Sequence, residues 1–165
     1  MSQSTLETRI KIIEDIEAIK KLMFNYTYWL DYGEMDKAVD CFSDNAKIDI
    51  KVRGSAEKGK NPFEFCCVGK EKINKFYHQI VHVKDRFSAS HFILNPVVEV
   101  DGDTATGIFY LLEPTAIKRS MWGHGRYDIE FIRVNDKWKI NLFGFLWNFN
   151  TPYEDGWVKT LMAMV

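Results

Sequence analysis

The sequence has 165 residues, of which 46% are hydrophobic and 15% aromatic, and its 22 basic and 23 acidic residues give a net charge of -1. A chain of this length is expected to form one domain, residues 1–165, whose core needs no cross-links. The near-zero net charge gives no indication of binding to nucleic acid or to an anionic membrane. The sequence contains no apolar run long enough to span a membrane and no signal-peptide core, and its three cysteines form no Cys-x-x-Cys pair, so we expect a cytoplasmic protein.

The first predicted element is a long amphipathic helix that ends near residue 31. Its apolar residues recur three or four positions apart. They are Ile12, Ile16, Ile19, Met23, Tyr26 and Leu30. Ser4 with Glu7 could form a capping box at the start, and Gly33 is suited to end the helix in the left-handed conformation. Asp31 then falls in the last turn, where the helix dipole disfavours a carboxylate, so it is either a solvated turn residue or a functional group.

The rest of the chain is predicted to contain two shorter helices and mostly strands. Helical spacing of apolar residues favours helices over residues 34–42 and 69–83. Alternation or β-propensity favours two short strands, residues 46–52 and 63–68, and four long ones, residues 88–100, 104–117, 121–134 and 138–149. Helices in the first half followed by a meander of strands predict an α+β fold, because a parallel sheet would alternate the two.

Four motifs carry a resemblance to a known family. They are residues 15–22 followed by Tyr26 and Asp31, the tripeptide Ser90-His91-Phe92, the pattern Gly69-x-x-x-Ile73-x-x-Phe76, and residues 104–107. With the order of elements, they resemble the SnoaL-like branch of the nuclear transport factor 2-like (NTF2-like) superfamily. This branch includes scytalone dehydratase, bile acid 7α-dehydratase and hexachlorocyclohexane dehydrochlorinase. The resemblance implies a cone-shaped α+β barrel, in which three helices from the N-terminal half pack against a curved mixed or antiparallel sheet.

The same resemblance implies a catalytic Asp31–His91 dyad with the phenol of Tyr26 beside it. An aspartate that accepts a hydrogen bond from one imidazole nitrogen leaves the other nitrogen free to take a proton. Each residue also has a plainer interpretation. His91 would be a core histidine with one satisfied hydrogen bond, and Tyr26 lies on the apolar stripe, so a packing role is equally compatible with its position.

The other predicted pocket residues depart from those of the relatives. At positions that resemble a pocket arginine and a strand aspartate of bile acid 7α-dehydratase, this sequence has Trp147 and Glu113. We therefore expect a more apolar pocket. His124, between two glycines in a predicted strand, is a candidate second polar group if it faces the cone. Tyr110 and Asn148 complete the predicted substrate-binding set.

No metal or cofactor is expected. His78 and His82 have a metal-like spacing, but no third ligand is evident, so they are predicted to be surface residues. Glycine-rich nucleotide-binding motifs and a nucleophilic serine motif are absent from the sequence.

The resulting hypothesis is a carbon–oxygen lyase that removes a proton from a hydrophobic cyclic or polycyclic hydroxylated small molecule and expels water. Isomerisation of the ketosteroid-isomerase type or polyketide-type cyclisation would use the same proton abstraction. A non-catalytic binding or assembly module is the alternative outside enzymes, and hydrogen bonding between Asp31 and His91 would favour an enzyme over it. The apolar C-terminal segment, residues 157–165, indicates a homo-oligomer, and the resemblance favours a trimer, with a dimer as the alternative.

Overall fold

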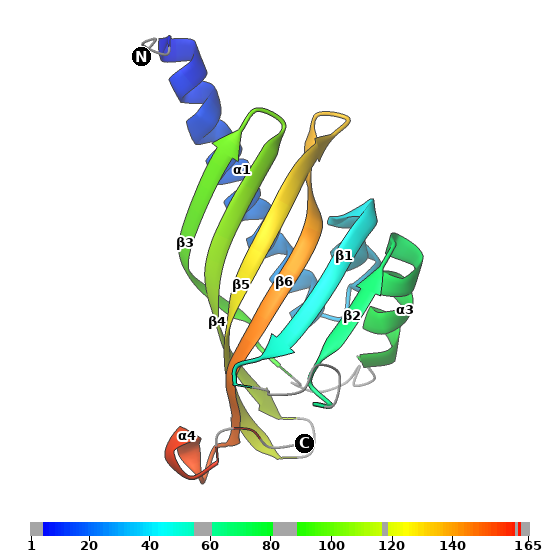
Figure 1. Ribbon diagram of the computed structural model, residues 1–165, viewed down its shortest axis with the longest axis vertical. Coiled ribbons are helices and arrows are strands. Elements are labelled where there is room, and N and C mark those ends of the chain that lie inside the picture. Colours follow the sequence, from blue (N-terminus) through cyan, green and yellow to red (C-terminus); the bar gives the residue numbers. More distant parts are fainter. Residues whose placement is uncertain (1–4, 55–60, 81–88, 117–118, 161, 163–165) are drawn as a thin grey trace.

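The computed structural model describes residues 5–54, 61–80, 89–116, 119–160 and 162. It confirms the predicted α+β class: a curved six-stranded sheet carries the helices of the N-terminal half against it (Figure 1). The sheet is open and does not close into a barrel. The helices are α1 (Leu6–Asp31), α2 (Met35–Asp40), α3 (Lys70–Ile80) and the short α4 (Gly156–Lys159). Among the described residues, no helix is long and apolar enough to cross a membrane.

The sheet is mixed because its first and last long strands run side by side. Its strand order is β2-β1-β6-β5-β4-β3. Strand β1 pairs in parallel with β6, and the other neighbouring strands are antiparallel. The strands are β1 (Phe42–Val52), β2 (Phe65–Val68), β3 (Phe92–Asp101), β4 (Thr104–Ala116), β5 (Ser120–Val134) and β6 (Lys137–Pro152). The six strands correspond to the six predicted, with shifted ends.

The starts of β1 and β3 are shifted most, by four residues each, and the shift of β1 lengthens the strand. The sequence pattern predicts a helix through residue 42 and a break over residues 43–45. In the structure Phe42 already pairs with Ile140 of β6, and the pairing resumes at Lys47 after a register shift. The polar residues in between therefore form an irregularity inside a strand, because a bulge can hold residues that a regular ladder would exclude.

The buried residues of helix α1 begin at Asp15, and its first turns are exposed. Ile19, Met23 and Tyr26 are buried as predicted, whereas Ile12 is exposed because the first turns extend past the sheet (Figure 1). The helix is capped by Thr5, whose hydroxyl accepts a hydrogen bond from the Thr8 N–H at 3.2 Å. The expected cap Ser4 lies outside the described residues.

Helix α1 is fixed to the far end of the sheet by a polar cluster. The Asp15 carboxylate lies 2.7 Å from Nη2 of Arg133 on β5 and accepts a hydrogen bond at 3.1 Å from the indole N–H of Trp138 on β6. Burial alone would raise the pKa of Asp15, but these two donors hold it below its ordinary value. The cluster orients the helix whose other end carries Asp31.

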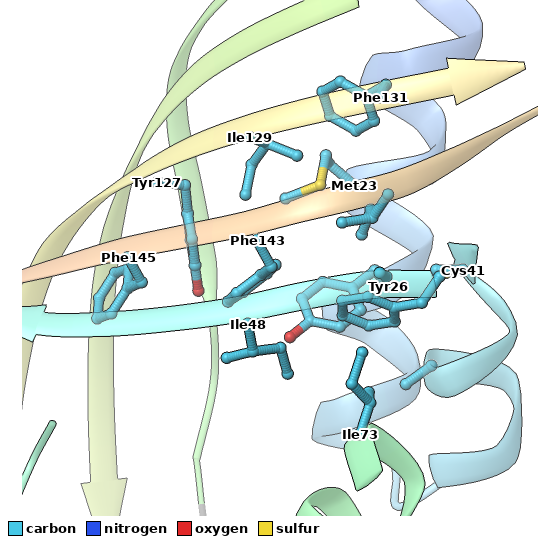
Figure 2. Packing of buried hydrophobic residues seen from close by; sticks show 14 of the residues in the cluster. Met23, Tyr26, Cys41, Ile48, Ile73, Tyr127, Ile129, Phe131, Phe143 and Phe145 are labelled. Atoms are coloured by element: carbon cyan, nitrogen blue, oxygen red, sulfur yellow. The ribbon is translucent and has the colours of Figure 1, made fainter. Parts of the chain in front are cut away.

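The core lies between α1 and one face of the sheet, which we call the inner face (Figure 2). This face carries the buried side chains of alternate residues, among them Phe109 of β4, Tyr127 of β5 and Phe143 of β6. The opposite, outer face exposes Phe92, Leu94, Val97 and Ile108. Such an apolar surface is compatible with the predicted homo-oligomer, which stays a prediction.

Candidate active site

Asp31 is the last residue of α1, and the backbone that follows it forms a Schellman motif. The N–H of Glu34 donates to the Trp29 carbonyl at 2.7 Å, and the N–H of Gly33 donates to the Leu30 carbonyl at 3.2 Å. Gly33 has φ +74°, the left-handed conformation that glycine adopts at least cost, so the predicted helix end is confirmed. This rigid turn holds the Asp31 carboxylate at the edge of the core.

His91 lies just before β3, not inside it as the sequence pattern predicts. Phe92 is the first residue of the strand, where it pairs with Leu112, and Ala89 forms an isolated bridge with Thr115. This register sets His91 opposite Glu113. The regular strand begins late because the backbone N–H of His91 donates to the two oxygens of Asp31, at 3.1 and 3.2 Å, and not to a neighbouring strand.

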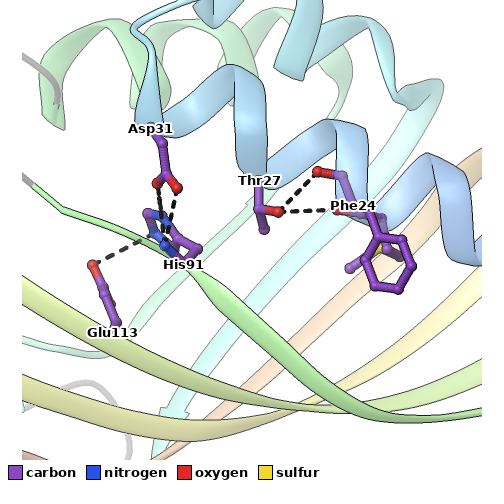
Figure 3. Close-up of polar contacts among 6 residues, drawn as sticks. Phe24, Thr27, Asp31, His91 and Glu113 are labelled. Atoms are coloured by element: carbon purple, nitrogen blue, oxygen red, sulfur yellow. Dashed lines mark hydrogen bonds and ion pairs between the residues drawn. The ribbon is translucent and has the colours of Figure 1, made fainter.

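The side chains of Asp31 and His91 form a short hydrogen bond. The Nδ1 atom of His91 lies 2.5 Å from Oδ1 of Asp31 (Figure 3). A carboxylate can only accept here, so the proton is assigned to Nδ1 and Nε2 is left without one when the ring is neutral. The two side chains retain 16% exposure each, which leaves them within reach of a ligand.

Glu113 is the third member of this group. Its Oε1 lies 3.5 Å from Nε2 of His91, the nitrogen that faces away from Asp31 (Figure 3), and its side chain is 13% exposed. Glu113 is one of the substrate-binding residues predicted from the sequence. The structure adds that it faces the free nitrogen of the candidate base.

The two carboxylates and the imidazole shift each other's proton affinities. Burial alone would lower the pKa of His91, but the charges of Glu113 and Asp31 raise it above its ordinary value. Burial raises the pKa of Glu113, against the opposing effect of His91. Because burial penalises separated charges, the form in which Glu113 holds a proton and His91 is neutral becomes accessible.

Two aromatic rings, the buried Phe145 and the partly buried Trp147, pack beside the site on the inner face. A Cβ atom added to Gly123 would meet Cζ3 of Trp147 at 3.0 Å and Oε2 of Glu113 at 3.4 Å, and one added to Gly125 would overlap the ring of Phe145. The two glycines therefore let the rings of Phe145 and Trp147 lie against the backbone of β5. The rings are in edge contact at 4.8 Å between centroids. Glycine in a strand often marks a close approach to the backbone, and the approaching groups here are these side chains.

Three of the predicted substrate-binding residues lie on the other side of the sheet. His124 follows Gly123 on β5 and so points to the outer face, where its ring stacks on Phe149 and contacts Tyr110. Asn148 hydrogen bonds to Nδ1 of His124 at 3.1 Å. The expectation that His124, Tyr110 and Asn148 line the pocket is therefore wrong, because strand alternation and a register shift at Asn148 turn them outward.

Tyr26 has the packing role that its position on the apolar stripe allowed. It is 2% exposed, and its ring is in edge contact with Phe42 and Phe143 (Figure 2 shows Tyr26 and Phe143 in the core). Its phenol is paired with the phenol of Tyr77 on α3 at 2.6 Å. The structure thus corrects the placement of Tyr26 beside the dyad, since the hydrogen-bond partner of its phenol is Tyr77.

Of the two histidines with metal-like spacing, the structure describes His78. His78 lies on the surface, where its Nε2 contacts Oδ1 of Asp36 at 3.1 Å. His82 is outside the described residues. In the part of the chain that is described, no group of three or more His, Cys, Asp or Glu side chains has the arrangement of a metal site.

Besides Phe145, the sequence-based prediction also missed the inner-face residue Tyr127. It is buried on β5 at the same strand parity as Gly123 and Gly125. Side chains alternate between the two faces of a strand, so the sequence already places Tyr127 on the same face as Gly123 and Gly125. Which of the two faces is the inner one could not be read from the sequence.

Comparison with known proteins gives both a family and a set of similar folds. The family described as SnoaL-like domain matches residues 11–143. A structure from Novosphingobium aromaticivorans, named as a candidate scytalone dehydratase, is 19% identical, with a TM-score of 0.71 over 86% of this chain and 89% of that one.

A candidate aromatic ring hydroxylase from the same organism is 25% identical, with a TM-score of 0.68 over 87% of this chain and 96% of that one. The hexachlorocyclohexane dehydrochlorinase LinA-type3 from Novosphingobium barchaimii is 19% identical, with a TM-score of 0.68 over 85% of this chain and 90% of that one. None of the curated proteins compared with this sequence matches it.

Proposed function

The chain belongs to the SnoaL-like domain family, and from that premise we propose that it is a lyase that needs no cofactor and removes water from a hydrophobic cyclic or polycyclic hydroxylated substrate. The observation that carries the proposal is the 2.5 Å contact between His91 Nδ1 and Asp31 Oδ1, with Nε2 directed to the other side. Structural neighbours named as dehydratase-type or dehydrochlorinase enzymes support the reaction class.

In the proposed reaction His91 acts as the base. Its Nε2 takes a proton from a carbon next to an activating carbonyl group, and the electron pair of the broken C–H bond forms an enolate. Asp31 stabilises the imidazolium and keeps its Nδ1–H oriented. The enolate then forms a carbon–carbon double bond as the bond to the leaving oxygen breaks.

Glu113 would supply the proton that the leaving oxygen needs. In its protonated form it gives this proton to the departing hydroxide, so that water leaves. The imidazolium of His91 then returns a proton across the 3.5 Å to Glu113, which restores both groups. The reaction consumes no external acid or base in this cycle. The apolar rings of Phe145 and Trp147 support it by excluding water from the substrate's side.

Isomerisation and cyclisation are the second candidate reactions, because each begins with the same proton transfer as the dehydration. Glu113 at Nε2 favours elimination over them, since it places a proton donor beside the base. A non-catalytic module is the less favoured alternative, because the dyad is within hydrogen-bond distance and partly exposed.

The proposal is tested by incubating the purified protein with a panel of hydroxylated bicyclic and polycyclic ketones. We expect mass spectrometry to find products that have lost one water. Products of unchanged mass would show isomerisation. If the folded protein converts no compound in a panel that covers several ring sizes, the proposed enzymatic activity is contradicted.

The pH dependence of the site follows from Glu113. In a Glu113→Gln variant we expect the pKa of His91 to fall, because the carboxylate charge that favours the imidazolium is gone. Glutamine cannot supply the proton for the leaving oxygen, so the activity of this variant should be lower than that of the wild type. Only neutral His91 can accept a proton, so the activity that is left would begin to rise at a lower pH than in the wild type. Titration of the His91 ring protons by NMR measures this pKa without a substrate.

The matched control is Glu99→Gln, which removes an exposed carboxylate from β3. It should leave the titration of His91 unchanged. A Glu113→Gln variant whose His91 titrates as in the wild type would show that Glu113 does not act on the imidazole.

A further inference from the structure

Strand β3 contains one extra residue a short way from the candidate active site. The pairing of β3 with β4 is regular up to Leu94 and resumes at Val97. Asn95 and Pro96, which lie between these two residues, stand opposite the single residue Phe109. Such an arrangement of two residues against one is a β-bulge. Bulges are frequent beside active sites, where they change the direction of a side chain.

Asn95 holds this bulge in a conformation that few residues adopt. Its φ is +51°, in the left-handed region, where residues other than glycine, asparagine and aspartate are strongly disfavoured. The residue that follows is Pro96, and a proline favours an extended conformation in the residue before it. Asn95 therefore departs from the conformation that its neighbour favours. Backbone strain of this kind persists where the surrounding structure holds it, often at functional sites.

The bulge determines which residue of β3 stands opposite Glu113. At the other end of the strand, the hairpin turn pairs Asp101 with Thr104 and fixes the register up to the bulge. If that register continued without a bulge, every residue on the far side would move by one position, and His91 would stand opposite Pro114. With the bulge, His91 stands opposite Glu113.

A shift of one position would turn both the ring and the backbone N–H of His91 away from Asp31. Paired residues share a face of the sheet, and Glu113 has the parity of the inner face, whereas Pro114 has that of the outer face. The N–H direction alternates as well. Ser90 donates a hydrogen bond to the Pro114 carbonyl at 3.1 Å, so the next N–H points away from β4. That N–H belongs to His91, and it reaches the carboxylate oxygens of Asp31 at 3.1 and 3.2 Å.

We propose that Asn95 is a positioning residue of the candidate active site. By holding the bulge, it places the ring of His91 on the inner face, between Asp31 and Glu113 (Figure 3). The role of His91 as a base rests on the proposed function, but the placement of its ring by Asn95 does not depend on turnover. A residue that cannot adopt positive φ at position 95 would flatten the bulge and separate the dyad.

Asn95→Val tests this role, because a β-branched residue is strongly disfavoured at positive φ. NMR of the protein without substrate reports the register. In the wild type we expect close contact between the Hα protons of His91 and Glu113, and in the variant Phe92 should replace His91 in this contact. The downfield signal of the Nδ1 proton that His91 shares with Asp31 should be lost. The value of kcat/KM should fall roughly 10²- to 10⁴-fold, the loss expected without the base.

Two further variants separate the register from a general loss of stability. Asn95→Gly keeps a residue that adopts positive φ freely, so the contact between His91 and Glu113 should remain. Deletion of Asn95 removes the extra residue, because Pro96 alone then stands opposite Phe109. The strand can pair regularly in this variant with His91 still opposite Glu113, so the dyad signal should also remain.

Asn135→Val is the matched control. Asn135 also has a positive φ, +49°, but lies in the turn between β5 and β6. This change should lower the melting temperature and leave the NMR signals of His91 unchanged.

A folded Asn95→Val protein that keeps the contact between His91 and Glu113 would overturn the proposal. If Asn95→Val does not fold, the deletion variant gives the answer: a retained dyad signal supports the role of the bulge, and its loss from a folded protein contradicts it. A wild type that shows the contact but dehydrates no compound would contradict the lyase and leave the role of Asn95 standing.

Discussion

Replacing His91 by glutamine is expected to lower kcat/KM for the dehydration by roughly 10²- to 10⁴-fold, the usual contribution of a positioned general base. Glutamine keeps a polar group near Asp31 but has no basic nitrogen, so the C–H bond of the substrate loses its proton acceptor. Fold should be retained, because the side chain lies at the edge of the core and is partly exposed. The measurement is the rate of product formation with any panel compound that the wild type dehydrates.

The chain offers a matched control for this variant. His78 also contacts a carboxylate, Asp36, at 3.1 Å, but the pair lies on the surface. We expect His78→Gln to leave the rate unchanged. If His91→Gln retained wild-type activity while folded, His91 could not be the base.

Replacing Asp31 by asparagine is expected to cost as much as 10⁴-fold in kcat, as in the aspartate-to-asparagine change of a serine protease triad. The amide N–H would donate to Nδ1 of His91, which moves the ring proton to Nε2 and blocks the nitrogen that takes the substrate proton. The amide oxygen can still accept from the backbone N–H of His91, so the turn should keep its geometry. Nitrogen NMR of the His91 ring measures the tautomer directly.

Asp36→Asn is the control, since it makes the same change beside His78. The double variant Asp31→Asn, His91→Gln should be little worse than either single variant, because the two residues act as one unit. Fully additive losses would mean that Asp31 acts on the substrate separately from His91.

Local pattern accounts for most of the fold. The period of apolar residues located α1, and Gly33 located its end, because a glycine that can adopt positive φ is a strictly local requirement. Alternation of apolar and polar residues located the long strands, because this pattern is also a local property of the sequence. The misjudged start of β1 depends on pairing between Phe42 and Ile140, residues far apart in the chain.

The candidate site likewise depends partly on local sequence and partly on tertiary structure. Asp31 and His91 were identified through resemblance to a family. The distance that joins them and the position of Glu113 opposite His91 follow from the packing of α1 on the sheet and from the register of β3 and β4.

Which face each strand residue occupies is a further tertiary property. A one-residue irregularity reverses the inward and outward sets, and such register shifts occur in several pairs of this sheet. Simple alternation along β4 and β5 turns Tyr110 and His124 outward, and the register shift between β5 and β6 accounts for Asn148. These three residues were therefore misplaced, while Tyr127 was overlooked.

The sequence by itself determined the α+β class, the end of the first helix and the residues able to form a base, because these depend on local periodicity and on motif. The tertiary structure alone decided which groups meet that base. It brought Glu113 to Nε2 of His91, lined the inner face with Phe145 and Trp147, and paired the phenol of Tyr26 with Tyr77. These contacts join distant parts of the chain, and their geometry is set by strand register and helix packing.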